Sequence, residues 1–214
     1  MGQADARLRG APAVTEAIRP AATVVLWREG PSGPEVLMGQ RGAGAVFMPS
    51  KYVFPGGGVD AGDALAPADH ALPALCAARL AQSVPSDAPT AGALAAAALR
   101  ELAEETGLTL AAPEGALRFI FRAITPPGRS RRFDARFFLV PADRIAGDAE
   151  DFAAASDELS HLHWIGTGAA RALDLPFVTE VVLAEVAALL AGHPDQGVPF
   201  FDNSGDRPVF RRLV

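Results

Sequence analysis

The stretch that decides the fold is LRELAEETGL, residues 99–108, in which three glutamates lie within five positions of a run otherwise rich in alanine and leucine. On a helix of 100° per residue, Glu101, Glu104 and Glu105 fall within an arc of roughly 100°. Leu99 and Leu102 point the other way. The stretch therefore predicts a helix over about 91–106 that has an apolar back and a carboxylate front and ends at a glycine, Gly107.

The three glutamates repel one another on such a helix, because like charges three or four residues apart destabilise it. They also lie in its last turns, where the helix dipole disfavours acids. A bound divalent cation would reverse both effects, since Mg²⁺ prefers carboxylate oxygens and keeps water and substrate phosphates as its other ligands. A solvated acidic face is the alternative that the glutamates alone leave open.

Residues 100–108 also resemble the second half of the Nudix signature: Arg-Glu, an aliphatic residue, any residue, Glu-Glu, any residue, Gly, an aliphatic residue. This resemblance implies an α+β fold, an α/β/α sandwich in which a mixed β-sheet is packed between helices. It implies a hydrolase of phosphorus-containing anhydrides. Glu101, Glu104 and Glu105 would then hold Mg²⁺ or Mn²⁺, and Arg100 would orient a carboxylate by a charge-assisted hydrogen bond.

The first half of the signature fits less well. Its glycine element is present as Phe54-Pro55-Gly56-Gly57-Gly58, and the resemblance implies that the Gly57 carbonyl is a metal ligand. Gly58 lies 42 positions before Arg100, where the family has 14. The sequence therefore predicts an insertion at about 61–90. Counting back from Arg100 places Gly92 where the family has a glutamate, so that glutamate has no assignable equivalent.

The rest of the chain reads as an arm followed by one domain. Residues 1–20 are predicted to be a flexible arm, and 21–214 a single domain whose tail, 193–214, has no clear pattern. Strands are predicted at 21–27, 35–40, 118–125, 133–140 and 161–165, and helices at 72–83, 91–106, 169–174 and 176–191.

The choice of substrate rests on a further resemblance, to coenzyme A diphosphatases with a long insertion before the Arg-Glu helix. In this chain the motif that these enzymes carry upstream of the glycines keeps its spacing but has lost several of its residue types, and Arg41 stands on its first arginine. The stretch from Phe47 to Gly57 is also similar to the corresponding stretch of these enzymes. This resemblance implies coenzyme A or an acyl-CoA as substrate, with Arg41 and Phe54 in its binding site. ADP-sugars and dinucleotides such as NADH are the alternatives.

Arginines after the turn at 126–131 are candidate phosphate contacts, because guanidinium groups bind phosphate oxygens in pairs. Arg132 and Arg136 share one strand face, and Arg136 is the favoured contact. Glu158, in a loop before the 161–165 strand, is the candidate general base, with Glu104 and Glu105 as alternatives. A module that senses a nucleotide without cleaving it is the competing class of function.

Composition sets limits on partners and location. The 214 residues carry a net charge of −6, which argues against a nucleic-acid binder and leaves a small-molecule nucleoside diphosphate derivative as the expected partner. Cys76 is the only cysteine, and no apolar run is long enough to span a membrane, so a reduced, cytoplasmic location is expected. The helical region 169–191 could support a homodimer.

Overall fold

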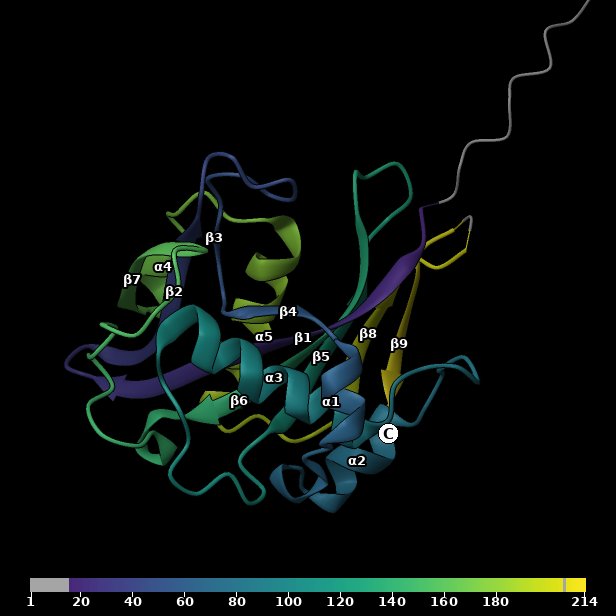
Figure 1. Ribbon diagram of the computed structural model, residues 1–214, viewed down its shortest axis with the longest axis horizontal. Coiled ribbons are helices and arrows are strands. Elements are labelled where there is room, and N and C mark those ends of the chain that lie inside the picture. Colours follow the sequence, from purple (N-terminus) through teal and green to yellow (C-terminus); the bar gives the residue numbers. More distant parts are fainter. Residues whose placement is uncertain (1–15, 206) are drawn as a thin grey trace, which may run out of the picture.

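A mixed β-sheet forms the centre of the computed structural model, which describes residues 16–205 and 207–214 (Figure 1). Its main path runs β3-β2-β1-β6-β5-β8-β9, and β4 pairs with β1 while β7 pairs with β2. The strands are β1 (Ile18–Gly30), β2 (Gly33–Arg41), β3 (Tyr52–Val53), β4 (Gly56–Gly58), β5 (Arg118–Ile124), β6 (Arg132–Pro141), β7 (Leu159–Gly166), β8 (Val198–Asp202) and β9 (Val209–Leu213).

Helices cover both faces of this sheet. The α-helices are α1 (Ala61–Leu65), α2 (Ala74–Leu80), α3 (Ala91–Thr106), α4 (Thr167–Ala170) and α5 (Phe177–Leu190), with 3₁₀ turns at Asp69–Ala71 and Ala142–Arg144. In Figure 1, α3 crosses in front of the sheet beside α1 and α2, and α5 lies behind it. The α+β sandwich predicted from the sequence is confirmed.

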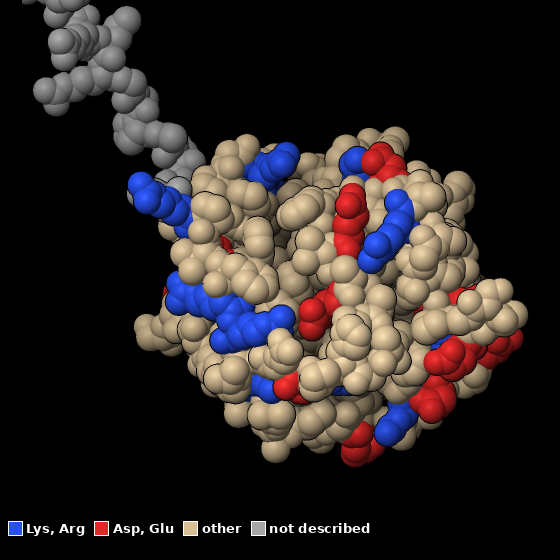
Figure 2. Space-filling view, turned by 180° about the vertical axis from the view of Figure 1, so that it is seen from behind, with Lys and Arg blue, Asp and Glu red and all other residues tan. Residues whose placement is uncertain are grey.

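Two apolar cores separate the layers. One packs α3 and the segment 68–80 against β1 and β6, and includes Leu94, Leu102 and Phe138. The other packs α5 on the opposite face through Val182, Leu183 and Val186. Figure 2 views the molecule from behind and shows a largely uncharged surface on which several acidic side chains lie beside basic ones.

The paired strands β5 and β6 and the helix α3 lie within one or two residues of their predicted bounds. The N-terminal arm is shorter than predicted, because β1 already begins at Ile18 and pairs in parallel with β6 from Arg132 onward. Residues 1–15 of that arm lie outside the described residues. The tail that lacked a pattern forms β8 and β9, and β8 extends the sheet by pairing in parallel with β5.

The helix α3 begins and ends as its sequence predicts. The Thr90 hydroxyl accepts a hydrogen bond from Ala93 N–H, and Gly107 ends the helix at φ 75°. A side chain at Gly107 would also meet the main chain of Ala154 and Ala155, so this glycine lets the loop before β7 approach the helix end. None of the helices in the described part of the chain is both long and apolar enough to span a membrane.

Candidate active site

The carboxylate front of α3 lies against the glycine strand β4. A Cβ atom on Gly57 would lie 2.4 Å from Glu101 Oε1, so only glycine permits this approach. The N–H of Gly56 donates a 2.7 Å hydrogen bond to Glu105 Oε2. β1 holds β4 in place, because Ala22 pairs with Gly57. The glycine element and the glutamate helix, far apart in the sequence, therefore form one site.

Arg100 ties the site together from one side. Its guanidinium donates to both carboxylate oxygens of Asp63 at 3.1 and 3.0 Å, to Glu101 at 2.8 Å and to Glu104 at 3.1 Å. It also donates to the Gly58 carbonyl at 2.9 Å. The predicted role of Arg100, to orient a carboxylate, has a geometric basis in these contacts.

The Arg100 contacts correct one sequence assignment. Asp63 lies six residues after Gly57, so with Gly57, and not Gly58, as the first glycine of the signature it stands at the glutamate position, with Asp in place of Glu. Counting back eight positions from Arg100 ends at Gly92, well short of Asp63. Gly92 lies instead in the first turn of α3, against the Asp69 carboxylate. The extra residues therefore follow Asp63, and the spacing counted forward from Gly57 was the signal that could have found it.

The charges of the site are strongly coupled. Burial tends to raise the pKa of Asp63, but the hydrogen bonds from Arg100 and from Asp60 N–H outweigh it and leave that pKa below its usual value. Burial raises the pKa of Glu101 despite Arg100, and Glu104 and Glu158 add to the rise. Burial raises the pKa of Glu105 to about 8, with Glu101 and Glu158 adding to it and Arg41 opposing it.

Glu104 and Glu158 border the site from its open side. The Glu104 side chain is 57% exposed and points toward Arg100. Ser156 N–H donates to the Glu104 carbonyl at 2.9 Å, which fastens the loop carrying Glu158 to the end of α3. The charge of Glu158 adds to the raised pKa of both Glu101 and Glu105, and its role as the base stays a prediction.

The residues fit a hard divalent cation that keeps part of its own hydration shell. Among residues 16–205 and 207–214, no three acidic, histidine or cysteine side chains converge closely enough to enclose a metal ion alone. Glu101 and Glu105 nevertheless place two largely buried carboxylates beside a glycine main chain, with raised pKa values that a cation would lower. Mg²⁺ is usually held by one or two carboxylates plus substrate phosphates.

The expected substrate residues fall into three environments. Arg41, at the end of β2, lies near enough to lower the pKa of Glu105, and its Nε is buried with no hydrogen-bond partner in the described chain. Phe54 is only 3% exposed and packs in the core under α5. Arg132 is also buried and donates to the carbonyls of Thr125 and Asn203. Phe54 and Arg132 thus have structural contacts, and their role in substrate binding stays a prediction.

Arg136 occupies a separate cavity, of about 350 Å³, between the sheet and the loop that precedes α3. It is 1% exposed and lies opposite Arg122 on the neighbouring strand. Asp134 lies between the two arginines, 2.8 Å from Arg122 and 3.0 Å from Arg136. The sequence predicted Arg136 on this strand face but gave no signal for Arg122 as its neighbour.

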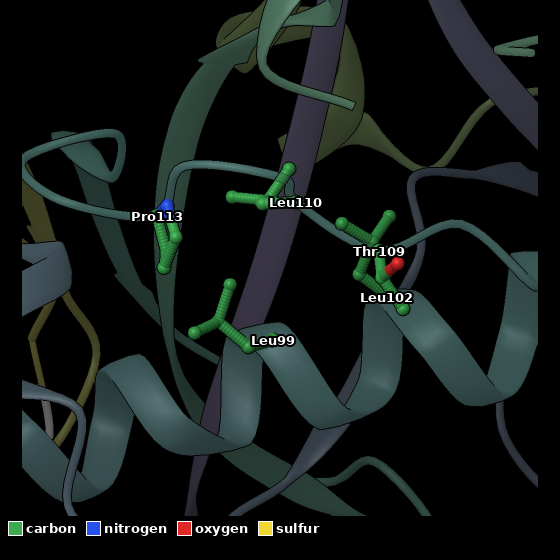
Figure 3. A pocket seen from close by; sticks show the side chains of 5 residues that line it. All are labelled: Leu99, Leu102, Thr109, Leu110 and Pro113. Carbon is green, nitrogen blue, oxygen red and sulfur yellow. The ribbon is translucent and has the colours of Figure 1, made fainter. Parts of the chain in front are cut away.

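A second cavity, of about 200 Å³, lies behind α3 (Figure 3). Leu99 and Leu102 of the helix point into it, opposite Leu110 and Pro113 of the segment after the helix. The predicted apolar back of α3 is therefore present. This cavity has no titratable lining residue, so it offers no group for acid–base or metal chemistry.

Comparison with known proteins supports the resemblance at the level of structure. No family model matches the chain, and no curated protein does. Among solved structures, a NUDIX hydrolase from Alicyclobacillus acidocaldarius is 26% identical, with a TM-score of 0.58 over 85% of this chain and 95% of that one.

Two more distant structures share the fold alone. The NUDIX domain of Shewanella oneidensis NrtR, solved as a complex with ADP-ribose, is 14% identical with a TM-score of 0.54, over 85% of this chain and 94% of that one. A MutT protein from Methanosarcina mazei is 16% identical with a TM-score of 0.52, over 83% and 97%. The chain therefore has the fold of the Nudix hydrolases.

Proposed function

We propose that the protein is a Mg²⁺- or Mn²⁺-dependent hydrolase that cleaves the diphosphate of a nucleoside diphosphate linked to another group. The observation that carries this proposal is the close apposition of α3 and β4, in which Glu101 lies against Gly57 and Glu105 accepts from Gly56 N–H. A solvated acidic face would not bury Glu105 to 2% exposure. A carboxylate buried at this cost is accounted for by a cation that binds there.

Each residue then has a defined task. Glu101 and Glu105 would hold the cation, with the Gly57 carbonyl and the exposed Glu104 as further donors at its edge. When bound, such a cation neutralises phosphate charge and lowers the pKa of a water molecule. Arg100 fixes the direction of the Glu101 carboxylate through a 2.8 Å hydrogen bond. Glu158, from its loop beside these carboxylates, would accept the proton of the attacking water.

Coenzyme A or an acyl-CoA is the proposed substrate. The support is the upstream element, in which Arg41 stands on the first arginine. The charge of Arg41 lowers the pKa of Glu105, and its Nε is a buried donor available for a phosphate oxygen. An ADP-sugar or a dinucleotide such as NADH is the alternative. The NrtR domain in complex with ADP-ribose favours including ADP-ribose in any substrate panel.

A substrate panel tests the proposal. The purified chain is incubated with coenzyme A, acetyl-CoA, ADP-ribose and NADH, with MgCl₂, with MnCl₂ or with EDTA, and products are resolved by chromatography. We expect cleavage only with a divalent cation, and its loss in Glu101→Gln and Glu105→Gln. Binding of a panel member without turnover would instead favour the sensing module. Full turnover by both Glu104→Gln and Glu105→Gln would show that the metal assignment is wrong.

A further inference from the structure

The cavity that holds Arg136 has the features of a ligand site built by the insertion. Its volume of about 350 Å³ lies within the range of roughly 300–1,000 Å³ that small-molecule pockets occupy. One wall is the loop 83–89 from the region of extra residues, and the other is the sheet face of β5, β6 and β8. The loop supplies apolar side chains, Val84, Pro85 and Pro89.

Arg122 holds the loop in place and thereby defines the cavity. Its Nη1 donates to the carbonyls of Gln82 and Ser83 at 3.2 and 3.0 Å, while its other nitrogens bind both oxygens of Asp134 at 2.8 Å. Its guanidinium also lies 4.1 Å from the ring centre of Phe200. Ser83 has φ 53°, a strained value for a residue with a side chain, which this double contact helps to maintain.

Arg136 leaves most of its N–H groups without an acceptor in the described chain, whereas Arg122 uses four of its five. Its Nη1 donates to the Asp134 carbonyl at 2.8 Å, and its Nη2 lies 3.0 Å from the Asp134 carboxylate. A guanidinium has five N–H groups, so three remain without an acceptor among the described residues although the side chain is 1% exposed. No Arg136 nitrogen is among the fully buried polar atoms that lack a partner in the described chain, so these N–H groups are open to the cavity that Arg136 lines, where a phosphate or carboxylate oxygen would accept from them.

The charges around the cavity agree with an anionic ligand at Arg136. Arg122 and Arg136 share the single carboxylate of Asp134, which leaves one positive charge uncompensated within this group. Asp202 also lines the cavity, but Arg211 and Ser204 already donate to its carboxylate at 2.9 and 2.6 Å. Asp87, the remaining acid of the lining, is exposed on the loop.

We infer that this cavity is a second anion site, in which Arg136 binds a phosphate group of a small molecule while the loop 83–89 and Phe200 contact its apolar or planar part. The cavity lining contains none of the three glutamates, although Arg136 lies opposite Ala22, the β1 residue that pairs with Gly57. The phosphate belongs either to a distal part of the substrate or to a separate effector. The first of these alternatives rests on the proposed function.

Binding without metal tests the site independently of turnover. Calorimetric titration with inorganic phosphate and with adenosine 3′,5′-bisphosphate in EDTA is done on the wild-type chain, Arg136→Gln, and the matched charge control Arg171→Gln, whose arginine is exposed between α4 and α5. We expect binding by the wild type and the control, and at least tenfold weaker binding by Arg136→Gln. Absence of binding, or equal affinity in all three, would overturn the inference.

A second variant guards against misfolding of Arg136→Gln, since that change leaves Asp134 with one partner fewer. Ala88→Trp fills the cavity from the loop side and removes no charge. We expect it to unfold near the wild-type temperature and to lose phosphate binding as well. Wild-type affinity in Ala88→Trp would place the bound phosphate elsewhere and refute the inference.

Kinetics with a matched substrate pair assign the source of the phosphate. Coenzyme A and 3′-dephospho-coenzyme A differ only in one phosphate. If that phosphate occupies the cavity, Arg136→Gln lowers kcat/KM for coenzyme A at least tenfold and leaves the dephosphorylated substrate unchanged. If a separate effector binds, the two substrates respond alike, and adenosine 3′,5′-bisphosphate changes the wild-type rate but not that of Arg136→Gln. If neither substrate is cleaved, the proposed function fails while the metal-free titration still decides the site.

Discussion

Glu105→Gln is the substitution whose effect on stability follows most directly from the structure. Glu105 is 2% exposed, and burial raises its pKa to about 8 from the usual 4.5. The folded protein therefore retains a proton that the unfolded chain releases between these two pH values. The free energy of unfolding without metal should fall as pH rises from about 4.5 to about 8, and stay constant on either side of that window.

The size of the effect follows from the shift in pKa. Each pKa unit corresponds to about 1.4 kcal/mol, so the full shift corresponds to about 5 kcal/mol. Local relaxation and entering water reduce such energies, and we expect a loss of about 2–5 kcal/mol between about pH 4.5 and 8.5. Glutamine keeps an oxygen for Gly56 N–H but has no charge. Glu105→Gln should therefore lack this part of the pH dependence and be the more stable protein at about pH 8.5.

Urea unfolding in EDTA at about pH 4.5, 6.5 and 8.5 measures the free energy of unfolding of the variant and of the wild type. The difference between the two at each pH isolates the contribution of Glu105 from that of other groups that titrate. Glu104→Gln is the matched control, because its carboxylate is 57% exposed. Saturating MgCl₂ at the highest pH should stabilise the wild type and leave Glu105→Gln unchanged. Equal pH dependence in wild type and Glu105→Gln would refute the idea that a buried, ionisable Glu105 awaits a cation.

Three further predictions concern the same site. Arg100→Ala leaves the buried Asp63, 4% exposed, without its ion-pair partner and should lower the free energy of unfolding by about 3–5 kcal/mol at pH 7, measured by urea titration. A loss below about 1 kcal/mol would contradict the Arg100–Asp63 ion pair. Gly57→Ala places a Cβ 2.4 Å from Glu101 Oε1 and should reduce kcat at least tenfold, with Gly42→Ala, in open space, as the unaffected control; equal rates would disprove the close approach. Glu158→Gln should lower kcat by about 10²–10⁴ with little change in KM and remove the acidic limb of the pH–rate profile; an unchanged profile would exclude it as the base.

The local sequence by itself determined much of the glutamate site. The spacing of three glutamates and two leucines fixed the faces of α3, and Gly107 fixed its C-terminal end, because helix periodicity and capping depend only on nearby residues. The β5–β6 pair followed from two apolar runs around a Pro-Gly turn. β8 and β9 gave no comparable signal, because their stability comes from pairing with distant strands.

Only the tertiary structure decided which distant residues meet. It paired Asp63 with Arg100 across the extra residues, gave Arg132 hydrogen bonds to main-chain carbonyls and packed Phe54 in the core. It also placed Arg122 beside Arg136 under the loop 83–89. Side-chain types state what chemistry a residue can perform, but burial and partners depend on which strands pair and in what register. That pairing is a non-local property, so the sequence indicated the glutamate site and left the arginine cavity undetected.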